Sequence, residues 1–263
     1  SDTTAVALAA ALKADRCQIL KDVDGVFTAN PRVVPAARKL DEIAYEEMLE
    51  LASAGSEVLQ SRAVEYAKNY GVVLEVLSSF EVKPGTLVRE EDAKMEQMII
   101  RGIAADKNQA KATLLGVPDT PGVAARIFKA LAGANLNVDM IVQNVSAAGV
   151  TDVSFTVAKD DISKTRRVIE PLVAEIKAAG LNFDPDIAKV SIVGVGMKSH
   201  SGVAYQMFEV LAAHRINIEM ISTSEIKISV AIRAQDADAA VRALHEAFGL
   251  AQAAPKAAKR KTK

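Results

Sequence analysis

The 263-residue chain has no tryptophan, one cysteine, three histidines and only 4% aromatic residues. The single Cys17 cannot form an internal disulfide, which suits a reducing compartment, so we expect a cytoplasmic protein with this thiol in its core. His200, His214 and His245 do not combine with it into a cluster of zinc-binding spacing. We therefore expect no metal site and no tightly bound cofactor.

Long apolar runs and a strong net charge are also missing. The sequence shows no apolar run long enough for a membrane span and no signal peptide, so we expect neither a membrane partner nor secretion. The formal net charge of −1 gives no general attraction to nucleic acid. Residues 251–263 are the basic exception, and we predict a disordered, solubilising tail there, because a nucleic-acid arm would need aromatic or groove-reading partners.

The dominant positive feature is an internal repeat. The first copy begins at Lys111 and the second at Lys189, and each continues through a Gly-Val pair, a helical Phe and Leu, and an Asn-x-acid-Met-Ile segment. Two copies are too few for a solenoid, which needs roughly three or more. We therefore predict two modules that pack on each other.

Each copy predicts the order strand, loop, helix, strand, strand, helix, which is the plan of an α+β, ferredoxin-like βαββαβ unit. In the first repeat the predicted elements are 111–116, 122–134, 137–144, 151–157 and 161–179. In the second repeat they are 189–194, 202–213, 217–222, 226–232 and 236–247.

Residues 1–88 predict a different, α/β arrangement, in which helices alternate with the strands of one sheet. The predicted helices are 2–14, 44–54 and 56–70, and the predicted strands are 17–20 and 72–76. Because the first helix starts at the first residue, we expect that a strand and a loop belong before it. The charged residues 89–97 predict a linker.

Both repeats offer polar groups beside a helix N-terminus, which suggests a site for a free amino acid at the interface between them. Backbone N–H groups before helix 122–134 suit a carboxylate, Asp119 suits an ammonium group, and Gln143 adds an amide. The candidates are Asp119, Gly122, Val123, Gln143 and Asn144, with the counterparts Met197, Ser199, His200, Val203, Asn217, Ser222, Thr223 and Glu225. The alternative is that these are turn and capping residues, with His200 a solvated or capping histidine.

Several stretches together resemble aspartate kinases (aspartokinases), over residues 1–249. They are 1–3, 22–32, 47–52, 78–86, 137–146, 151–156, 194–200, 217–229 and 244–248. The resemblance is to the C-terminal two-thirds of that family. It implies that 1–94 are the nucleotide side of an amino-acid-kinase domain, and that 95–185 and 186–250 are two ACT domains, the second interleaved with strands of the first.

The resemblance also implies an activity and its regulation. Aspartate kinases transfer the γ-phosphate of ATP, with Mg²⁺, to the β-carboxylate of L-aspartate in lysine, threonine and methionine biosynthesis. Their ACT domains bind L-lysine, L-threonine or both as feedback effectors, and a homo-oligomer formed through these domains is implied. Asp22, Phe27 and Arg32 would flank the nucleotide.

The chain departs from the family pattern where nucleotide and substrate would bind. Two glycine-rich segments of the family are absent apart from Ser1 and Asp2, so the catalytic residues stay unassigned. Lys21 replaces a threonine, and Glu57 stands in the place of a phosphate-contacting lysine, which reverses the charge there. We therefore predict that this chain alone is catalytically incomplete.

Three interpretations stay open at this point. The chain is part of a working aspartate kinase, or it is a non-catalytic regulatory subunit that binds amino acids. For such a short subunit, Met95 would be a plausible internal start. The third interpretation is a structural scaffold whose ligand sites are vestigial.

Overall fold

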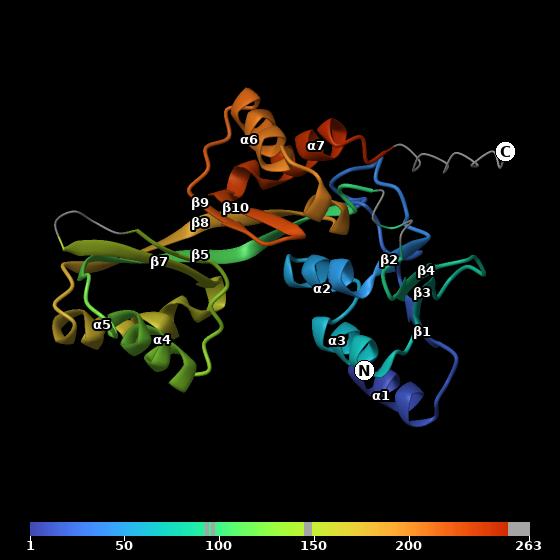
Figure 1. Cartoon of the computed structure of the whole chain (residues 1–263), viewed down its shortest axis with the longest axis horizontal. Coiled ribbons are helices and arrows are strands. Elements are labelled where there is room, and N and C mark those ends of the chain that lie inside the picture. Colours follow the sequence, from blue (N-terminus) through green and yellow to red (C-terminus); the bar gives the residue numbers. More distant parts are fainter. Residues whose placement is uncertain (93–94, 96–97, 145–148, 252–263) are drawn as a thin grey trace.

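The computed structural model describes residues 1–92, 95, 98–144 and 149–251. They form a four-stranded sheet with the order β1-β3-β4-β2 and a six-stranded sheet with the order β6-β7-β5-β8-β10-β9, each flanked by helices (Figure 1). The predicted combination of an α/β part and an α+β part is confirmed. Residues 252–263 of the predicted tail lie outside the described residues.

The N-terminal part, residues 1–92, contains the smaller sheet. Its elements are α1 (Asp2–Ala11), β1 (Cys17–Lys21), β2 (Glu42–Ala44), α2 (Tyr45–Ser53), α3 (Ser61–Tyr70), β3 (Leu74–Ser78) and β4 (Thr86–Arg89). The predicted helices and strands are all present, but α1 ends three residues early and α3 starts five residues late. The short strands β2 and β4 were not predicted, because three or four residues carry too little alternation to show a period.

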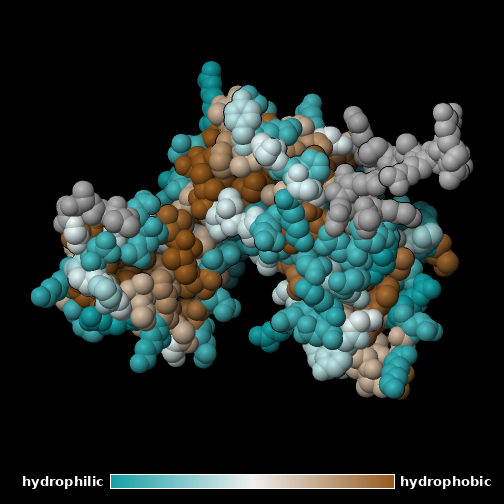
Figure 2. All heavy atoms as spheres, viewed as in Figure 1, coloured by the Kyte–Doolittle hydropathy of each residue, from teal (hydrophilic) through white to brown (hydrophobic). Residues whose placement is uncertain are grey.

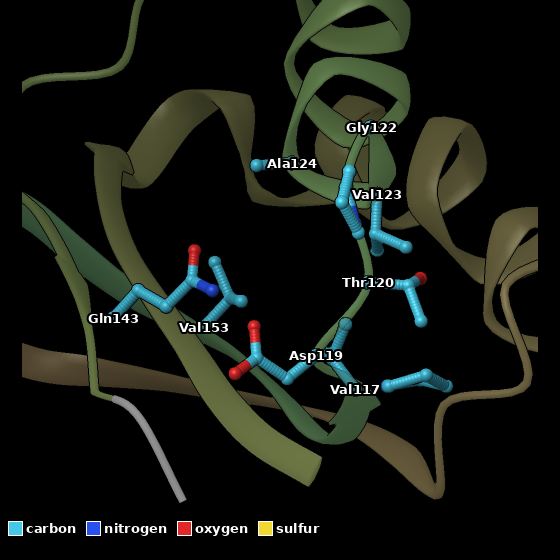
Figure 3. Close-up of a pocket in the computed structure, with 10 residues that line it drawn as sticks. Val117, Asp119, Thr120, Gly122, Val123, Ala124, Gln143 and Val153 are labelled. Carbon is cyan, nitrogen blue, oxygen red and sulfur yellow. The ribbon is translucent and has the colours of Figure 1, made fainter. Parts of the chain in front are cut away.

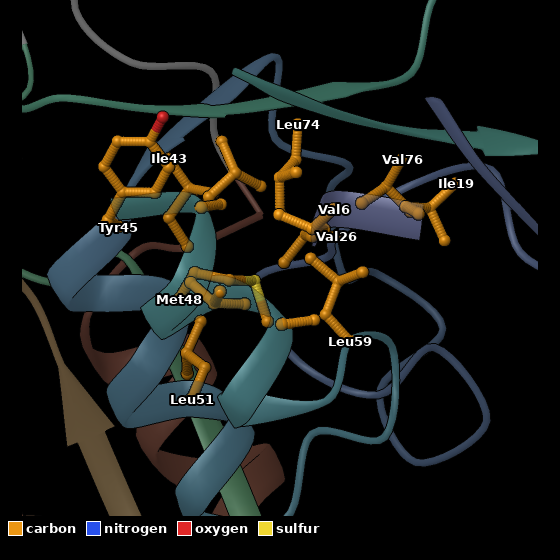
Figure 4. Close-up of a cluster of buried hydrophobic side chains, with 14 of the residues drawn as sticks. Val6, Ile19, Val26, Ile43, Tyr45, Met48, Leu51, Leu59, Leu74 and Val76 are labelled. Atoms are coloured by element: carbon orange, nitrogen blue, oxygen red, sulfur yellow. The ribbon is translucent and has the colours of Figure 1, made fainter. Parts of the chain in front are cut away.

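The core of the N-terminal part lies between its helices and its sheet (Figure 4). Val6 of α1 and Met48 of α2 pack with residues of β1 and β3, whose side chains alternate between buried and partly exposed. Cys17 belongs to this buried cluster, as predicted. Full burial of each such side chain stabilises the fold by about 1.5–3 kcal/mol.

The remaining described residues form the six-stranded sheet and its helices. The elements are β5 (Gly102–Pro118), α4 (Val123–Gly133), β6 (Ile141–Gln143), β7 (Val150–Ala158), α5 (Ile162–Glu175), β8 (Gly180–Val193), η3 (Val195–Ser199), α6 (Val203–Ala213), β9 (Met220–Thr223), β10 (Lys227–Arg233) and α7 (Ala237–Ala247). Several predicted bounds need correction. The helix predicted over 161–179 ends at Glu175, and the strands predicted over 137–144 and 217–222 start only at Ile141 and Met220. The strands predicted over 111–116 and 189–194 begin earlier, at Gly102 and Gly180.

The two repeats share their longest strands. Residues 102–106 of β5 pair with 189–193 of β8, whereas residues 111–115 of β5 pair with 180–184 of β8. The first repeat thus has the strand order β6-β7-β5-β8, and the second has β9-β10-β8-β5. Each repeat is a complete four-stranded βαββαβ unit, and the second one receives its fourth strand from residues that precede the first.

The helices of the two repeats lie on opposite faces of the shared sheet. Helices α4 and α5 pack on the first repeat, α6 and α7 cover the other face of the second, and α2 lies on the second repeat's remaining face (Figure 1). A hollow separates α4 and α5 from the N-terminal part (Figure 2). No helix among the described residues has the length and apolarity needed to cross a bilayer.

Candidate ligand pocket and its connections

A pocket of about 310 Å³ opens in the first repeat, where the chain leaves β5 and enters α4 (Figure 3). Residues 117–124, Gln143 of β6 and Val153 of β7 line it. Gln143 lies directly opposite Val153 in the strand register, and β7 in turn pairs with the end of β5. This pairing brings together Asp119, Gly122, Val123 and Gln143, four of the residues predicted for the ligand.

The pocket combines groups of opposite polarity. The carboxylate of Asp119 and the carboxamide of Gln143 point into the same space (Figure 3). Helix α4 begins there, and its first N–H groups have no acceptor within the helix, which favours a bound anion. Gly122 precedes the helix with a φ of 92°, a backbone conformation that strains other residues. The arrangement can hold a small molecule that carries both an ammonium and a carboxylate group.

The apolar walls and the exact position of the pocket were not evident from the sequence. Val117, Val123 and Val153 supply apolar surface, and Val153 reaches the pocket only through strand pairing. All lining residues belong to the first repeat, so a contribution from the second repeat stays a prediction. Asn144 is exposed and outside this lining, and its carbonyl oxygen accepts a hydrogen bond from the Thr151 hydroxyl.

The second-repeat candidates occupy the equivalent loop and strand end. Met197 and Ser199 lie in η3, and His200 follows it. Val203 starts α6, and Ser222 and Thr223 end β9. Asn217 and Glu225 lie on either side of β9. The Nδ1 atom of His200 lies 2.8 Å from the Gly196 carbonyl oxygen and 3.2 Å from the Ser199 hydroxyl. These contacts fit the capping interpretation of His200, and the ligand role of the set stays a prediction.

The loop that begins at Gly194 is attached to helix α2. The buried carboxylate of Glu47 accepts hydrogen bonds from the Val195 N–H at 3.0 Å and from Nε of Arg101 at 3.0 Å. Burial raises the pKa of Glu47, and the Arg101 charge opposes this rise. A Cβ atom on Gly194 would lie 2.2 Å from the Ile99 carbonyl oxygen. The start of this loop therefore has no freedom to shift independently of α2 and residues 99–101.

A second buried contact joins the expected nucleotide loop to the second repeat. The hydroxyl of Thr28 lies 2.9 Å from Nε2 of His245 on α7, and burial lowers the pKa of His245. Ala29 and Val34 belong to the buried cluster under α6 and α7. The segment between β1 and β2 is thus packed against the second repeat as well as against its own sheet.

The residues expected near the nucleotide are mostly exposed. Asp22 and Arg32 lie on the surface of the segment between β1 and β2, and Phe27 is partly buried there beside Lys39. The Arg32 N–H donates to Oδ1 of Asn30 at 2.9 Å. Glu57 is exposed in the connection between α2 and α3.

The two substituted positions add opposite charges to this region. The ammonium group of Lys21 pairs with the carboxylate of Asp2 at 2.9 Å, so that buried aspartate already has a cation.

Among the described residues, no group of three acidic, histidine or cysteine side chains is arranged to hold a metal ion. The described side chains do not form a metal site by themselves.

Family models and relatives agree with this architecture. The ACT domain model matches residues 113–171 and 190–248, and the amino acid kinase family model matches residues 1–78. The aspartate kinase of Pseudomonas fluorescens is 59% identical over 251 residues, which are 95% of this chain and 61% of that protein. The chain thus spans about three-fifths of the length of the curated relatives that it matches.

Solved structures show the same similarity. Aspartokinase III of E. coli in complex with aspartate and ADP is 31% identical with a TM-score of 0.82, covering 94% of this chain and 55% of that chain. Its complex with lysine and aspartate gives a TM-score of 0.74 at the same identity and coverage. The regulatory subunit of aspartate kinase from Thermus thermophilus is 47% identical with a TM-score of 0.55, over 57% of this chain and 99% of that chain. The chain belongs to the aspartate kinase family.

Proposed function

We propose that this chain belongs to a feedback-regulated aspartate kinase and that its first-repeat pocket binds the regulating amino acid. The convergence of the Asp119 carboxylate, the Gln143 amide and the N-terminus of α4 supports this most strongly. The complete enzyme would phosphorylate the β-carboxylate of L-aspartate with ATP in the cytoplasm, for the biosynthesis of lysine, threonine and methionine. Mg²⁺ would enter with the ATP.

The proposed effector is L-lysine, L-threonine or both. The α-carboxylate would take N–H groups at the start of α4, where the Val123 N–H donates to the Thr120 carbonyl oxygen at 3.3 Å in the ligand-free chain. The α-ammonium would meet Asp119, and Gln143 would hold polar atoms. The lysine complex of E. coli aspartokinase III makes lysine a reasonable candidate. The second-repeat set from Met197 to Glu225 is the proposed counterpart, in which Glu225 would reach the side chain of a lysine.

We propose the division 1–94 for the nucleotide-side kinase part, with the ACT domains at 95–185 and 186–250 interleaved through residues 102–106. Asp22, Phe27 and Arg32 would flank the nucleotide in the complete enzyme. We propose further that the chain is incomplete for catalysis, because Lys21 neutralises Asp2 and Glu57 puts an anion where phosphates need cations. These two residues favour the non-catalytic regulatory subunit as the second candidate. A homo-oligomer would form through the ACT domains.

Isothermal calorimetry with L-lysine and L-threonine tests the effector site. We expect binding by the unmodified chain, and a weakening of about 10–100-fold in Asp119→Asn, since a hydrogen bond to a charged group contributes about 1.5–3 kcal/mol. Asp15→Asn changes the same charge at an exposed position of the N-terminal part and should leave binding unchanged. The absence of heat from both amino acids at millimolar concentration would contradict the proposed regulation.

Coupled ADP release tests the catalytic part of the proposal. We expect the chain to show no ATP turnover that depends on aspartate, because Glu57 places an anion where the phosphates need cations. Turnover clearly above the blank without aspartate, and abolished by Asp22→Ala, would show that the chain is catalytically competent.

A further inference from the structure

We propose that Lys189 relays the position of the first repeat to helix α2 of the N-terminal part. Its ammonium group forms an ion pair with Asp139 and donates to the Ser53 carbonyl oxygen at 3.1 Å. Asp139 lies in the segment that leads into β6, and Ser53 is the last residue of α2. One side chain of the second repeat thereby joins the first repeat to the N-terminal part.

Burial makes the contacts of Lys189 costly to break. The Lys189 side chain is only 3% exposed, so water cannot replace a partner that moves away. The partial negative charge at the C-terminus of α2 suits an ammonium group, and the Asp139 carboxylate neutralises it. If Asp139 shifts, Lys189 must follow it or lose its counter-charge, and either response changes the contact with Ser53.

Helix α2 is well placed to receive such a signal, because one of its sides lies along the second repeat. Glu47 accepts from the Val195 N–H, Glu50 pairs with Lys227 at 2.7 Å, and Ser53 accepts from Lys189. These three positions are spaced three residues apart, as on one side of a helix. The chain continues from Ser53 into the segment 54–60, which contains Glu57.

The first repeat provides an internal comparison for this ion pair. Lys111 occupies the position of Lys189 in the repeat pattern, and it pairs with Glu219, which occupies the position of Asp139. Glu219 is also paired with Arg233 of β10 at 2.7 Å. Lys111, Glu219 and Arg233 therefore form a cluster on the six-stranded sheet. The same cross-repeat ion pair therefore occurs twice, but the contact to Ser53 is made by Lys189.

The relay also connects the pocket to α2, and this step rests on the proposed effector site. Gln143 lines the pocket and lies four residues after Asp139 in the same short segment. An amino acid that fixes Gln143 would restrict β6 and with it Asp139. Lys189 would then transmit this restriction to the end of α2.

Hydrogen exchange of residues 53–60 in the ligand-free chain tests the relay without any assumption about the effector. We expect Asp139→Asn and Lys189→Met to accelerate exchange there by about threefold or more, as local opening becomes easier. Glu219→Gln and Lys111→Met are the matched controls and should leave these amides unchanged. In the Lys189→Met background, Asp139→Asn should have no further effect.

Three outcomes would overturn the relay. The first is unchanged exchange of residues 53–60 in Asp139→Asn, an isosteric change of a side chain that is 37% exposed, which keeps the test valid if Lys189→Met does not fold. The second is an equal acceleration in Lys111→Met, which would show general loosening of the fold. The third is acceleration by Asp139→Asn that persists in the Lys189→Met background.

A ligand arm separates the relay from the effector site. With L-threonine or L-lysine bound, as verified by calorimetry, exchange of residues 53–60 should change in the unmodified chain and stay constant in Lys189→Met. Binding that leaves these amides unchanged in the unmodified chain would refute the relay and keep the effector site. Absence of binding would refute the effector site, and the ligand-free arm would still decide on the relay.

Discussion

The two repeats follow one sequence plan, yet their equivalent faces have different neighbours. Helix α2 covers the second repeat, where Lys189 is 3% exposed and the hydroxyls of Ser191 and Ser229 form a buried contact of 2.8 Å. On the matching face of the first repeat, Lys111 is 21% exposed, and the equivalent hydroxyl contact, Thr113 to Ser154 at 3.0 Å, is only partly buried.

The loops before the first helix of each repeat also differ in what they contact. The loop of the first repeat surrounds the pocket, whereas the second begins with an N–H group that is bound to the buried Glu47. Similar residues therefore acquire different roles from what packs against them. We therefore expect a ligand to bind at the first repeat, whereas the second repeat is attached to the N-terminal part through Glu47.

The largest expected difference between the repeats concerns the glycine that ends the first strand motif of each, Gly116 and Gly194. Alanine substitution should cost more stability at Gly194 than at Gly116. Gly194→Ala should lower the free energy of unfolding by about 3 kcal/mol or more, because the new Cβ would meet the Ile99 carbonyl oxygen and backbone would have to move. Gly116→Ala would bring the new Cβ to 2.9 Å from the Cβ of Ala179, a longer approach than at Gly194, and would impose a φ of 58°, so we expect about 1–2 kcal/mol. Urea denaturation of both variants measures the difference. Equal losses in the free energy of unfolding would show that Gly194 is no more closely packed than Gly116.

Removing the charge of Glu47 should have an effect of similar size. Glu47→Gln leaves the buried Arg101 without its counter-charge, and breaking a buried pair typically costs about 3–5 kcal/mol. Glu50→Gln, on the same side of α2, removes a half-buried pair with Lys227 and should cost less than about 1 kcal/mol. Chemical denaturation of both variants provides the test. A Glu47→Gln variant as stable as Glu50→Gln would show that the contacts of Glu47 with Arg101 and with the second repeat contribute little to stability.

The burial of His245 should make stability depend on pH. Burial lowers the pKa of His245 in the folded state, so the unfolded state binds the proton more readily, and the free energy of unfolding falls as pH drops below about 6.5. The slope from this group is at most about 1.4 kcal/mol per pH unit. His245→Gln should flatten the profile between about pH 7 and 5, whereas His214→Gln, at an exposed position, should preserve it. An unchanged profile in His245→Gln would contradict this account.

The sequence predicted what depends on local pattern. The repeats, their helices and the pocket residues Asp119, Gly122 and Gln143 follow from periodicity and from the polar groups next to a helix start. The sharing of strands was implied only by the family resemblance, because residues 102–106 themselves carry no sign of which repeat they complete until they pair with β8.

The contacts that join the parts could not be predicted either. Glu47 and Arg101 are 54 positions apart, and Thr28 and His245 are 217 positions apart, so nothing local marks either pair. Val153 enters the pocket for the same reason, through the register in which β7 pairs with β6.

A crystal structure of the chain grown with saturating L-lysine or L-threonine tests the central claim most directly, namely that the first repeat is the receptor. We predict electron density for the amino acid in the pocket of residues 117–124, with its ammonium group within hydrogen-bonding distance of Asp119 and its carboxylate at the first N–H groups of α4. An amino acid bound only at the loop 194–203 of the second repeat, with the first pocket empty, would contradict the claim.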